Sequence, residues 1–512
     1  MASPLSRREF LKLSGLLSAH TLLPTYFLKP GVPAEVNLNK ENVLIVVFDA
    51  WSAANTSLYG YGRKTTTHLE RLAEKAVVYH NHFAGGNFTT PGTASLLTGA
   101  HPWSHRAFIL NTTVREDFAH QNNFQVFTGY NRIAYTHNPI ADTLLTQFMP
   151  DIDAYLPMHH LYLEKDFLID VLFAKDRDAA AVSVNRALKQ KEDGFAYSLY
   201  LSRFYENYLK GVSEKRSELN AAFPRGVPNY DGLSYFTLEE GINGVLESIG
   251  DPSQPFLGYY HFLPPHNPYK TRVDFFNRFA KDGHSPVGKE DHLFAKETNA
   301  ENIDYKRRLY DEFILYVDSE FARLYAQMES SGLLDNTWLI LTSDHGEMFE
   351  RGILGHMTPS LHQPVIHVPL VIFPPGQQTR VDIDAATSAV DLLPTLCQVT
   401  GQQIPVWAEG KVLTPFSASP SSSNQDVFAL QASSTGENSR ITMGTVMLVR
   451  GQYKLTWYFG YEKLGQDGEL VELYDLSTDP EELQNLALRR PDLVETLLKV
   501  AKSKLDEMDR PA

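Results

Sequence analysis

The amino-acid sequence predicts an α/β fold in which a mostly parallel central sheet is flanked by helices. Three continuous apolar runs, at residues 42–48, 256–262 and 336–342, are typical of strands buried on both faces of a parallel sheet. Amphipathic patterns between them, at residues 67–77 and 305–331, predict helices. Each apolar run also leads into ionisable side chains, and open α/β sheets place their ligands just past the carboxyl ends of their strands.

The composition excludes several classes of protein. The chain has 512 residues, of which 43% are hydrophobic and 21% charged, so it can build a large core and is not a disordered protein. With 46 basic against 61 acidic residues, its formal net charge of −15 argues against nucleic acid or an anionic membrane surface as the main partner. Cys397 is the single cysteine, so a metal would have to be bound by oxygen and imidazole ligands.

The N-terminal segment, residues 1–34, has the features of an export signal. Residues 6–12 read SRREFLK and precede a moderately apolar stretch, which resembles the bacterial twin-arginine signal. We therefore expect the twin-arginine translocase as a partner and a periplasmic or other extracytoplasmic location. The alternative is an ordinary basic amphipathic N-terminus, and retention of the segment as an anchor stays open because no good cleavage site follows it. No later stretch has the 18 or more apolar residues of a membrane helix.

The rest of the chain is predicted to form a main α/β domain and a smaller subdomain. The main domain covers residues 40–400 and is interrupted at 141–250 by a region that we interpret as a helical insertion, either a lid over the site or a packed helical layer. Residues 401–512 predict a small C-terminal α+β subdomain. Its expected antiparallel strands lie at residues 427–430, 442–449 and 453–458, and its closing helix at 491–506.

Residues 89–99 (TTPGTASLLTG) predict a helix that begins beside Thr89. Pro91 suits the first turn of a helix, Thr90 can cap it and Gly99 can end it. The free N–H groups and the positive end of the helix dipole would then favour a tetrahedral oxyanion in front of Thr89. By itself, this segment is explained equally well by a threonine with only a capping role.

Three side chains that follow the apolar runs favour a metal site over a simple cap. Asp49, Asp344 and His345 offer two carboxylates and an imidazole at one sheet edge, which suits a divalent cation. A cation that also touched the Thr89 hydroxyl would lower its pKa and so create a nucleophile. Each residue has an ordinary explanation as a strand-end cap, a helix cap or a surface histidine, but their coincidence favours the metal site.

A series of motifs, in order between about residues 40 and 490, resembles the sulfatases of the alkaline phosphatase superfamily. The motifs are Asp49 with residues 58–62 (LYGYG), 89–99, 265–269 (PHNPY), 342–347 (TSDHGE), 355–356 (GH), 368–372 (VPLVI), 390–395 (VDLLPT), 473–476 (LYDL) and 479–481 (DPE). The resemblance implies the alkaline-phosphatase/sulfatase-like fold and an ester hydrolase.

The resemblance also implies one divalent metal ion. Asp49, Asp344 and His345 match metal ligands, and Thr89 falls on the nucleophile that also touches the metal. Ala50 stands where calcium-binding sulfatases often have another aspartate, and His345 where they usually have asparagine. Imidazole in place of oxygen moves the preference towards Mn²⁺ or Zn²⁺, with Ca²⁺ and Mg²⁺ as alternatives.

Four further residues stand at positions that handle substrate in the family, three of them as matches and one as a departure. His266 matches a histidine that binds the substrate anion and can protonate the leaving oxygen. His356 matches a lysine or histidine that binds the same oxyanion or the leaving group. Asn138 lies where relatives place a polar substrate contact, and Thr93, which replaces the arginine of the sulfatase motif, is assigned to substrate binding with it.

The nucleophile position departs from the sulfatase pattern and decides the predicted function. Sulfatases have a cysteine or serine there that is oxidised to formylglycine, which Thr89 cannot yield; threonine is typical of branches that transfer phosphoryl groups. We therefore predict a metal-dependent hydrolase that acts on phosphate (diester or phosphonate-type) or sulfate esters of small molecules, glycans or lipids through a covalent Thr89 intermediate. The alternatives are a phospho-group transferase to an envelope lipid or glycan, a true sulfuric ester hydrolase without formylglycine, and a catalytically inactive binding protein.

Overall fold

The computed structural model describes most of the chain. The described residues are 40–163, 210–211, 213–214, 216–230, 235–249, 254–296, 299–417, 425–432, 439–465 and 468–510. The predicted export segment, residues 1–34, lies outside them, as do residues 164–209 of the predicted insertion. Within the described ranges, no helix has both the length and the apolar character needed to cross a membrane.

A central sheet of eight strands confirms the predicted α/β fold. In spatial order its strands are β11 (Val381–Ile383), β2 (Val77–Tyr79), β10 (Leu370–Phe373), β7 (Thr337–Thr342), β1 (Asn42–Phe48), β6 (Phe256–Phe262), β4 (Asn131–Thr136) and β5 (Ala154–Tyr155). Strand β10 runs antiparallel to both of its neighbours, and the other neighbouring pairs are parallel. The sheet is therefore mixed but mostly parallel.

The three predicted strands lie side by side at the centre of this sheet, in the order β7-β1-β6. Every residue of β1 is buried, and Val47 pairs in register with Thr342 of β7 and His261 of β6. Since the three strands are parallel, their carboxyl ends meet at one edge, as the sequence predicted.

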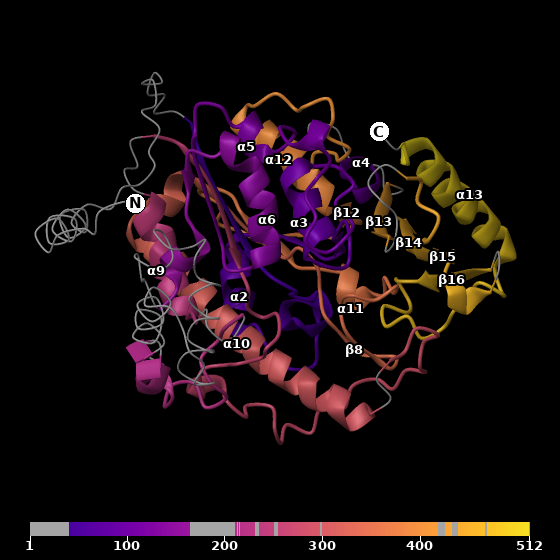
Figure 1. Cartoon of the computed structure of the whole chain (residues 1–512), viewed down its shortest axis with the longest axis horizontal. Coiled ribbons are helices and arrows are strands. Elements are labelled where there is room, and N and C mark those ends of the chain that lie inside the picture. The colour runs from indigo at the N-terminus through magenta and orange to yellow at the C-terminus, as the bar shows by residue number, and fades with distance from the viewer. Residues whose placement is uncertain are drawn as a thin grey trace, which may run out of the picture. The chain divides into compact units, whose positions relative to one another are not determined.

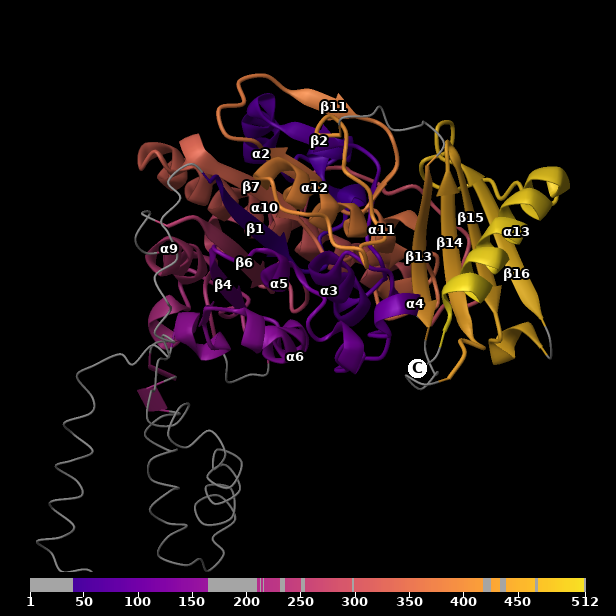
Figure 2. The same cartoon turned by 90° about the horizontal axis from the view of Figure 1, so that it is seen from above.

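Helices cover both faces of the sheet (Figures 1 and 2). On one face, Leu44 and Val46 belong to a core shared with α2 (Thr67–Leu72), α9 (Leu238–Ile249) and α10 (Ala300–Ser330). On the other, Val43 and Val47 pack in a core with α3 (Thr89–Thr98), α5 (Asn123–Val126), α6 (Pro139–Phe148) and α12 (Leu392–Thr400). The predicted helix at 305–331 is confirmed within α10. The helix predicted at 67–77 is shorter, because a 3₁₀ turn at Ala73–Lys75 leads into β2.

The C-terminal part forms a four-stranded antiparallel sheet and a helix (Figure 2). Its strands are β13 (Asp426–Ala432), β14 (Gly444–Arg450), β15 (Tyr453–Phe459) and β16 (Glu469–Asp475), and its helix is α13 (Pro491–Met508). Leu497 and Leu505 of α13 pack on one face of the sheet, and Met447 on the other face packs with Phe83 and Ile366 of the main domain. The sequence predicted β13, β14, β15 and α13 but not β16, and the boundary at residue 401 stays a prediction.

Short elements complete the described fold. They are β3 (His82–Phe83) paired with β12 (Thr387–Ser388), the hairpin of β8 (Met348–Glu350) and β9 (Ile353–Gly355), α4 (Pro102–His105) and α11 (Gln363–Ile366). The β8-β9 hairpin follows β7 directly and is the element that connects the TSDHGE motif to His356.

Candidate active site

The end of β1 is tied to the end of β7 through Ala50. The backbone of Ala50 has a φ of 58°, in the left-handed region that a residue with a side chain seldom adopts. This turn directs its N–H towards Asp344 Oδ1 at 3.3 Å, while its carbonyl accepts a hydrogen bond from the Tyr310 hydroxyl at 2.6 Å. Asp49, the preceding residue, is held fully buried beside Asp344.

His345 presents one ring nitrogen to both carboxylates. Its Nδ1 lies 2.9 Å from the carbonyl oxygen of Gly346, and since a carbonyl only accepts, Nδ1 carries the proton. Its Nε2 lies 3.3 Å from Asp49 Oδ1 and 3.6 Å from Asp344 Oδ2. Such a backbone hydrogen bond fixes the tautomer that a metal-binding histidine needs.

Thr89 is the first residue of α3 and reaches the same place. Its Oγ1 lies 3.4 Å from His345 Nε2, and the residue is buried. The predicted cap at Thr90 is wrong: the N-cap is Phe88, in extended conformation, and Thr90 lies inside the helix with no partner for its hydroxyl. Gly99 ends the helix as predicted, at a φ of 68°. Because no side chain caps α3, the N–H groups of its first turn remain available to an oxyanion.

Helix α3 approaches the β7 loop so closely that only glycine fits at residue 92. A Cβ atom at Gly92 would lie 2.1 Å from the carbonyl oxygen of Asp344. One residue further, Thr93 Oγ1 donates a hydrogen bond to Asp344 Oδ2 at 3.3 Å. The structure therefore directs Thr93 towards a carboxylate of the site, and its role in substrate binding stays a prediction.

Asn138 connects the Thr89 hydroxyl to Asp49. Its Oδ1 caps α6 by accepting a hydrogen bond from the N–H of Ile140 at 2.7 Å, which fixes the orientation of the amide. Its Nδ2 therefore faces the site, where it donates to Asp49 Oδ2 and to Thr89 Oγ1, the latter at 3.2 Å. A direct contact between Asn138 and substrate stays a prediction.

His266 and His356 lie together at the outer side of this group. The His356 ring centroid lies 4.4 Å from that of His345 and 5.0 Å from that of His266. Nδ1 of His356 lies 2.9 Å from Oε1 of the fully buried Glu347, whose Oε2 accepts a hydrogen bond from the Tyr269 hydroxyl at 3.2 Å. His266 is only half-buried, so the row of three imidazoles extends from the buried carboxylates to the surface.

The electrostatics of the site suit a cation. Burial raises the pKa of Asp49, but three neighbouring histidines outweigh it and hold the pKa well below its usual range; they are His266, His261 and His345. Burial lowers the pKa of His345, but Asp344 and Asp49 raise it to about 9. The two carboxylates therefore strongly favour a positive charge between them.

The donor atoms present fit a divalent cation. One ligand atom each from Asp49, Asp344 and His345 lie within 4.8 Å of one another, and all three residues are buried. Asp49 Oδ1 makes no hydrogen bond with any described residue, and a buried carboxylate oxygen without a donor is costly unless a cation compensates it. These three residues would hold the ion, and a contact between the ion and the Thr89 hydroxyl stays a prediction.

Sequence reasoning missed His261 and Glu347. His261 lies in β6, where a single histidine within an apolar run is most simply explained as a core residue. Its Nε2 nevertheless lies 3.3 Å from Asp49 Oδ2. Glu347 belongs to the TSDHGE motif, but only the folded hairpin shows that it bonds His356, nine residues away along the chain.

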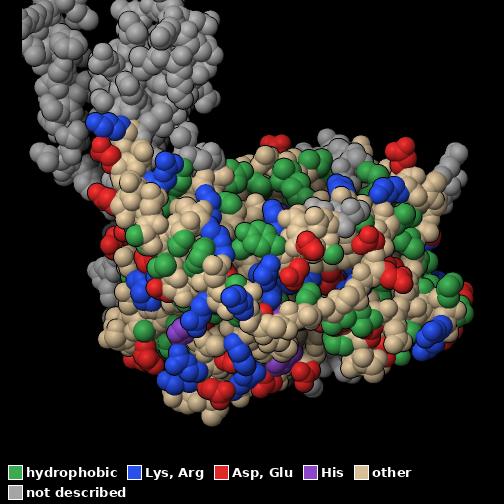
Figure 3. Space-filling view, turned by 90° about the horizontal axis from the view of Figure 1, so that it is seen from below, with side chains coloured by type: hydrophobic (Ala, Val, Ile, Leu, Met, Phe, Trp, Pro, Cys, Tyr) green, Lys and Arg blue, Asp and Glu red, His purple; other side chains and the backbone are tan. Residues whose placement is uncertain are grey.

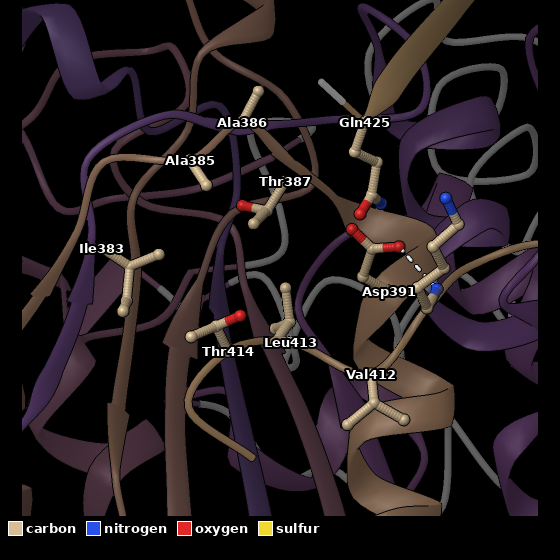
Figure 4. Close-up of a pocket in the computed structure, with 10 residues that line it drawn as sticks. Ile383, Ala385, Ala386, Thr387, Asp391, Val412, Leu413, Thr414 and Gln425 are labelled. Carbon is tan, nitrogen blue, oxygen red and sulfur yellow. Dashed lines mark hydrogen bonds between the residues drawn. The ribbon is translucent and has the colours of Figure 1, made fainter. Parts of the chain in front are cut away.

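A separate small pocket, shown in Figure 4, is not a second candidate. It lies between β11, α12 and residues 411–414, and Asp391 is an acidic residue in its lining. Both carboxylate oxygens of Asp391 accept backbone hydrogen bonds at 2.8 Å, from the N–H groups of Lys411 and Ser388. This carboxylate is satisfied by the protein itself and therefore has a structural role.

Comparisons with known proteins establish the family. The profile described as Sulfatase matches residues 41–402, and that described as N-sulphoglucosamine sulphohydrolase, C-terminal, matches residues 358–510. The chain therefore belongs to the sulfatase family. It is 24% identical over 503 residues to the Multifunctional alkaline phosphatase superfamily protein PehA of Trinickia caryophylli, covering 88% of this chain and 92% of that protein. It is 30% identical to Arylsulfatase K of Rattus norvegicus over 232 residues, which are 44% of this chain and 38% of that relative.

Solved structures show the same fold. The Phosphonate Monoester Hydrolase of Agrobacterium radiobacter superposes with a TM-score of 0.63 at 20% identity, covering 91% of this chain and 96% of the other. A 2-O GAG sulfatase superposes with a TM-score of 0.60 at 18% identity, covering 91% of each chain. The protein is thus a sulfatase-like ester hydrolase of a family whose enzymes bind a divalent metal, and its Asp-Asp-His group is a possible site for that metal.

Proposed function

We propose that this protein is a metal-dependent hydrolase of phosphate diesters or phosphonate monoesters, and that Thr89 is its nucleophile. The observation that carries the proposal is the position of Thr89 Oγ1, which lies 3.4 Å from His345 Nε2 and 3.2 Å from Asn138 Nδ2 in front of an uncapped helix N-terminus. Sulfate esters are the second candidate substrates, because Arylsulfatase K and a 2-O GAG sulfatase are among the similar proteins.

In the first half of the proposed reaction, Thr89 forms a covalent bond to phosphorus and the leaving group departs. A divalent cation held by Asp49, Asp344 and His345 would lower the pKa of the Thr89 hydroxyl. Thr89 Oγ1, having lost its proton to solvent, attacks phosphorus, and the bond from phosphorus to the leaving oxygen breaks. The N–H groups of the first turn of α3 stabilise the charge that develops on the phosphoryl oxygens.

Proton transfer to the leaving oxygen falls to His266 or His356. Nδ1 of His266 donates to the carbonyl oxygen of Asn267 at 2.6 Å, so its Nε2 is the nitrogen that exchanges a proton with substrate. In the second half of the reaction, water attacks phosphorus and the bond to Thr89 Oγ1 breaks. The hydroxyl of water stays on phosphorus, its proton returns to the imidazole, and Oγ1 takes up a proton from solvent.

Threonine favours phosphorus over sulfur as the reacting centre. Formylglycine releases its ester by elimination from a hydrate, a route that the Thr89 alcohol does not have. A Thr89 ester must instead be cleaved by attack of water on the central atom, and threonine nucleophiles are typical of phosphoryl-transferring branches of the superfamily. This chemistry is the reason to rank phosphate and phosphonate above sulfate.

The metal and the cellular setting belong to the same proposal. With an imidazole among the ligands, we propose Mn²⁺ or Zn²⁺ as the ion. The proposed substrates are small-molecule, glycan or lipid esters, which the twin-arginine signal would place outside the cytoplasm. A net charge of −15 disfavours nucleic acid, and side chains of both signs occur across the face shown in Figure 3.

The test compares Thr89→Ala with Thr89→Ser, which keeps a hydroxyl at the same place. Wild type and both variants are assayed with Mn²⁺ or Zn²⁺ on matched aryl phosphate diester, phosphonate, phosphate monoester and sulfate substrates. We expect Thr89→Ala to lose about 10⁴-fold in kcat and Thr89→Ser to retain measurable turnover. Acid-quenched wild type should carry a phosphoryl group on Thr89, detected by mass spectrometry.

Each other outcome selects a competing function. Near-wild-type activity of Thr89→Ala would contradict the nucleophile assignment. A faster reaction with the aryl sulfate would make the protein a sulfuric ester hydrolase. Formation of a phosphorylated alcohol when an alcohol acceptor is added would indicate a transferase, and failure to turn over any substrate or bind a divalent ion would indicate a binding protein.

A further inference from the structure

We propose that His261 is a fourth protein ligand of the catalytic cation, together with Asp49, Asp344 and His345. The inference rests on the metal site of the proposed function and adds a residue to it. His261 is fully buried near the carboxyl end of β6. It pairs in register with Val47, which packs in the same core as Ala94 and Leu97 of α3. Since paired residues of parallel strands face the same side of a sheet, His261 points to the side from which α3 brings Thr89.

The distances around His261 match those expected between ligands of one ion. Its Nε2 lies 3.3 Å from Asp49 Oδ2 and 3.8 Å from Asp344 Oδ2. Two ligand atoms that are each about 2.1 Å from a metal ion lie about 3.0–3.8 Å apart when the angle between them is about 90–130°. The separations of His345 Nε2 from the same two carboxylates, 3.3 and 3.6 Å, fall in the same range.

Within the described residues, the Nε2 atom of His261 makes no hydrogen bond, although the side chain is completely buried. Buried polar atoms are normally hydrogen-bonded, and one without a partner requires an explanation. Coordination of a cation between Asp49 and Asp344 supplies that explanation and also satisfies Asp49 Oδ1, the other atom of the site that makes no hydrogen bond.

The contacts of His261 are compatible with an unprotonated Nε2. Its Nδ1 lies 3.2 Å from the Tyr259 hydroxyl oxygen, which can accept a hydrogen bond from it. With the proton on Nδ1, the lone pair of Nε2 is free for a metal.

His261 would supply the fourth protein ligand of the ion from strand β6. Ala50, next to Asp49, has no donor atom in its side chain, so a further protein ligand has to come from another strand. Two carboxylates and two imidazoles form a donor set that suits Zn²⁺ or Mn²⁺ better than Ca²⁺ or Mg²⁺. The inference therefore sharpens the proposed metal preference.

The first test counts imidazole ligands in the unmodified full chain. Wild-type protein is stripped with EDTA, loaded with one equivalent of Mn²⁺ and studied by electron spin-echo envelope modulation. We expect couplings to the nitrogens of two imidazoles. A single coupled imidazole would overturn the inference, and this result does not depend on whether any variant folds.

The second test measures Mn²⁺ and Zn²⁺ affinity by calorimetry in His261→Ala, with His82→Ala as the matched control. His82 is another buried strand histidine, but its Nδ1 contacts the Thr387 hydroxyl. We expect affinity to fall about 10- to 100-fold in His261→Ala and to stay unchanged in His82→Ala, with one coupled imidazole left in the former. Unchanged affinity in a folded His261→Ala would overturn the inference.

The two proposals fail separately. If Thr89→Ala is inactive as expected but only one imidazole is coupled, the assignment of His261 is wrong and the proposed function stands. If two imidazoles are coupled but Thr89→Ala is active, the metal site stands and the nucleophile is wrong.

Discussion

Two of the buried clusters of acidic and basic side chains differ in how their carboxylate oxygens are satisfied. We name them by their members: the cation cluster consists of Asp49, Asp344, His345 and His261, and the interface cluster of Glu472, Glu482, Lys454, His292 and His362. The interface cluster joins the C-terminal sheet to loops of the main domain, whereas the cation cluster lies at the carboxyl edge of the central sheet.

The interface cluster contains its own countercharges. Glu482 Oε1 accepts a hydrogen bond from Lys454 Nζ at 2.7 Å, and Oε2 accepts one from the N–H of Gln363 at 2.9 Å. Glu472 accepts from the Tyr458 hydroxyl at 2.8 Å and lies 3.5 Å from one nitrogen each of His292 and His362. These carboxylates are compensated within the protein, so their role is to hold the two parts of the chain together.

The cation cluster is compensated only in part, by its own histidines. Asp49 Oδ1 has no hydrogen-bond donor, and in the part of the chain that the structure describes no lysine or arginine pairs with Asp49 or Asp344. The comparison shows that burial and the presence of histidine do not distinguish a metal site from a structural ion pair. What distinguishes them is that Lys454 donates to a carboxylate of the interface cluster, whereas the carboxylates of the cation cluster have no such lysine or arginine among the described residues.

The largest expected effect comes from Asp344→Asn, which breaks the cation cluster. Asparagine keeps an acceptor oxygen for the N–H groups of Ala50 and His345 but removes one negative charge. We expect kcat/KM to fall about 10³-fold or more, and added Mn²⁺ no longer to raise the unfolding temperature. Metal-free stability should be equal or higher, because two buried carboxylates no longer repel each other. Steady-state kinetics and thermal unfolding with and without Mn²⁺ measure this; a wild-type Mn²⁺ shift in the variant would refute it.

Lys454→Met breaks the interface cluster and should affect stability instead of metal binding. It leaves the Glu482 carboxylate buried without its cation, and removal of one partner of a buried pair costs about 3–5 kcal/mol of unfolding free energy. Urea unfolding measures the loss. The double variant Lys454→Met/Glu482→Gln is the control and should regain most of it, while Mn²⁺ affinity stays at the wild-type value. Equal stability of Lys454→Met and wild type would contradict the comparison.

Glu472 of the interface cluster should make the stability of the protein depend on pH. Burial raises the pKa of Glu472, but His362 and His292 outweigh it and lower the pKa to about 2, against 4.5 for an ordinary glutamate. Because the folded pKa is the lower one, this stabilisation is fully present above about pH 4.5 and is lost as the pH falls towards about 2. Its size is about 3 kcal/mol.

The variant Glu472→Gln tests whether Glu472 causes part of the loss of stability at low pH. Urea unfolding at about pH 6 and about pH 3 should show a smaller pH-dependent loss of stability in Glu472→Gln than in wild type. The same loss in both proteins would mean that other carboxylates cause the acid sensitivity.

The smallest expected effect comes from Gly92→Ala, which disturbs the cation cluster without changing a ligand. The added Cβ would lie 2.1 Å from the carbonyl oxygen of Asp344, so α3 and the β7 loop must move apart, at a cost of about 1–3 kcal/mol. The affinity for Mn²⁺ should fall together with the stability. Gly288→Ala, where an added Cβ meets nothing within 4 Å, is the control and should change stability by less than about 0.5 kcal/mol. Equal effects of the two substitutions would show that the contact with Asp344 does not matter.

Much of the central sheet and four residues of the site could be predicted from the sequence. Strands β1 and β6 have the predicted bounds, because a buried parallel strand is an apolar run with polar residues at its end. Asp49, Asp344, His345 and Thr89 come together as expected, since parallel strands and the helix N-terminus that follows them face one edge.

Local sequence patterns did not predict features that depend on contacts with residues far away along the chain. Strand β16 has a polar residue at every third position and so lacks the alternation of a half-buried strand; only its pairing with β15 makes it a strand. The start of α3 at Thr89 instead of after Thr90 was likewise invisible to residue preferences alone.

The sequence by itself determined which chemistry is available: two carboxylates, an imidazole and a threonine hydroxyl at one sheet edge, without a cysteine for formylglycine. Only the tertiary structure decided which nitrogen of each histidine faces the carboxylates, that Thr93 bonds Asp344, that Glu347 holds His356 and that His261 joins the group. The physical reason is that these contacts join residues of different strands and helices. Their distances follow from strand order and register, which short-range sequence patterns do not contain.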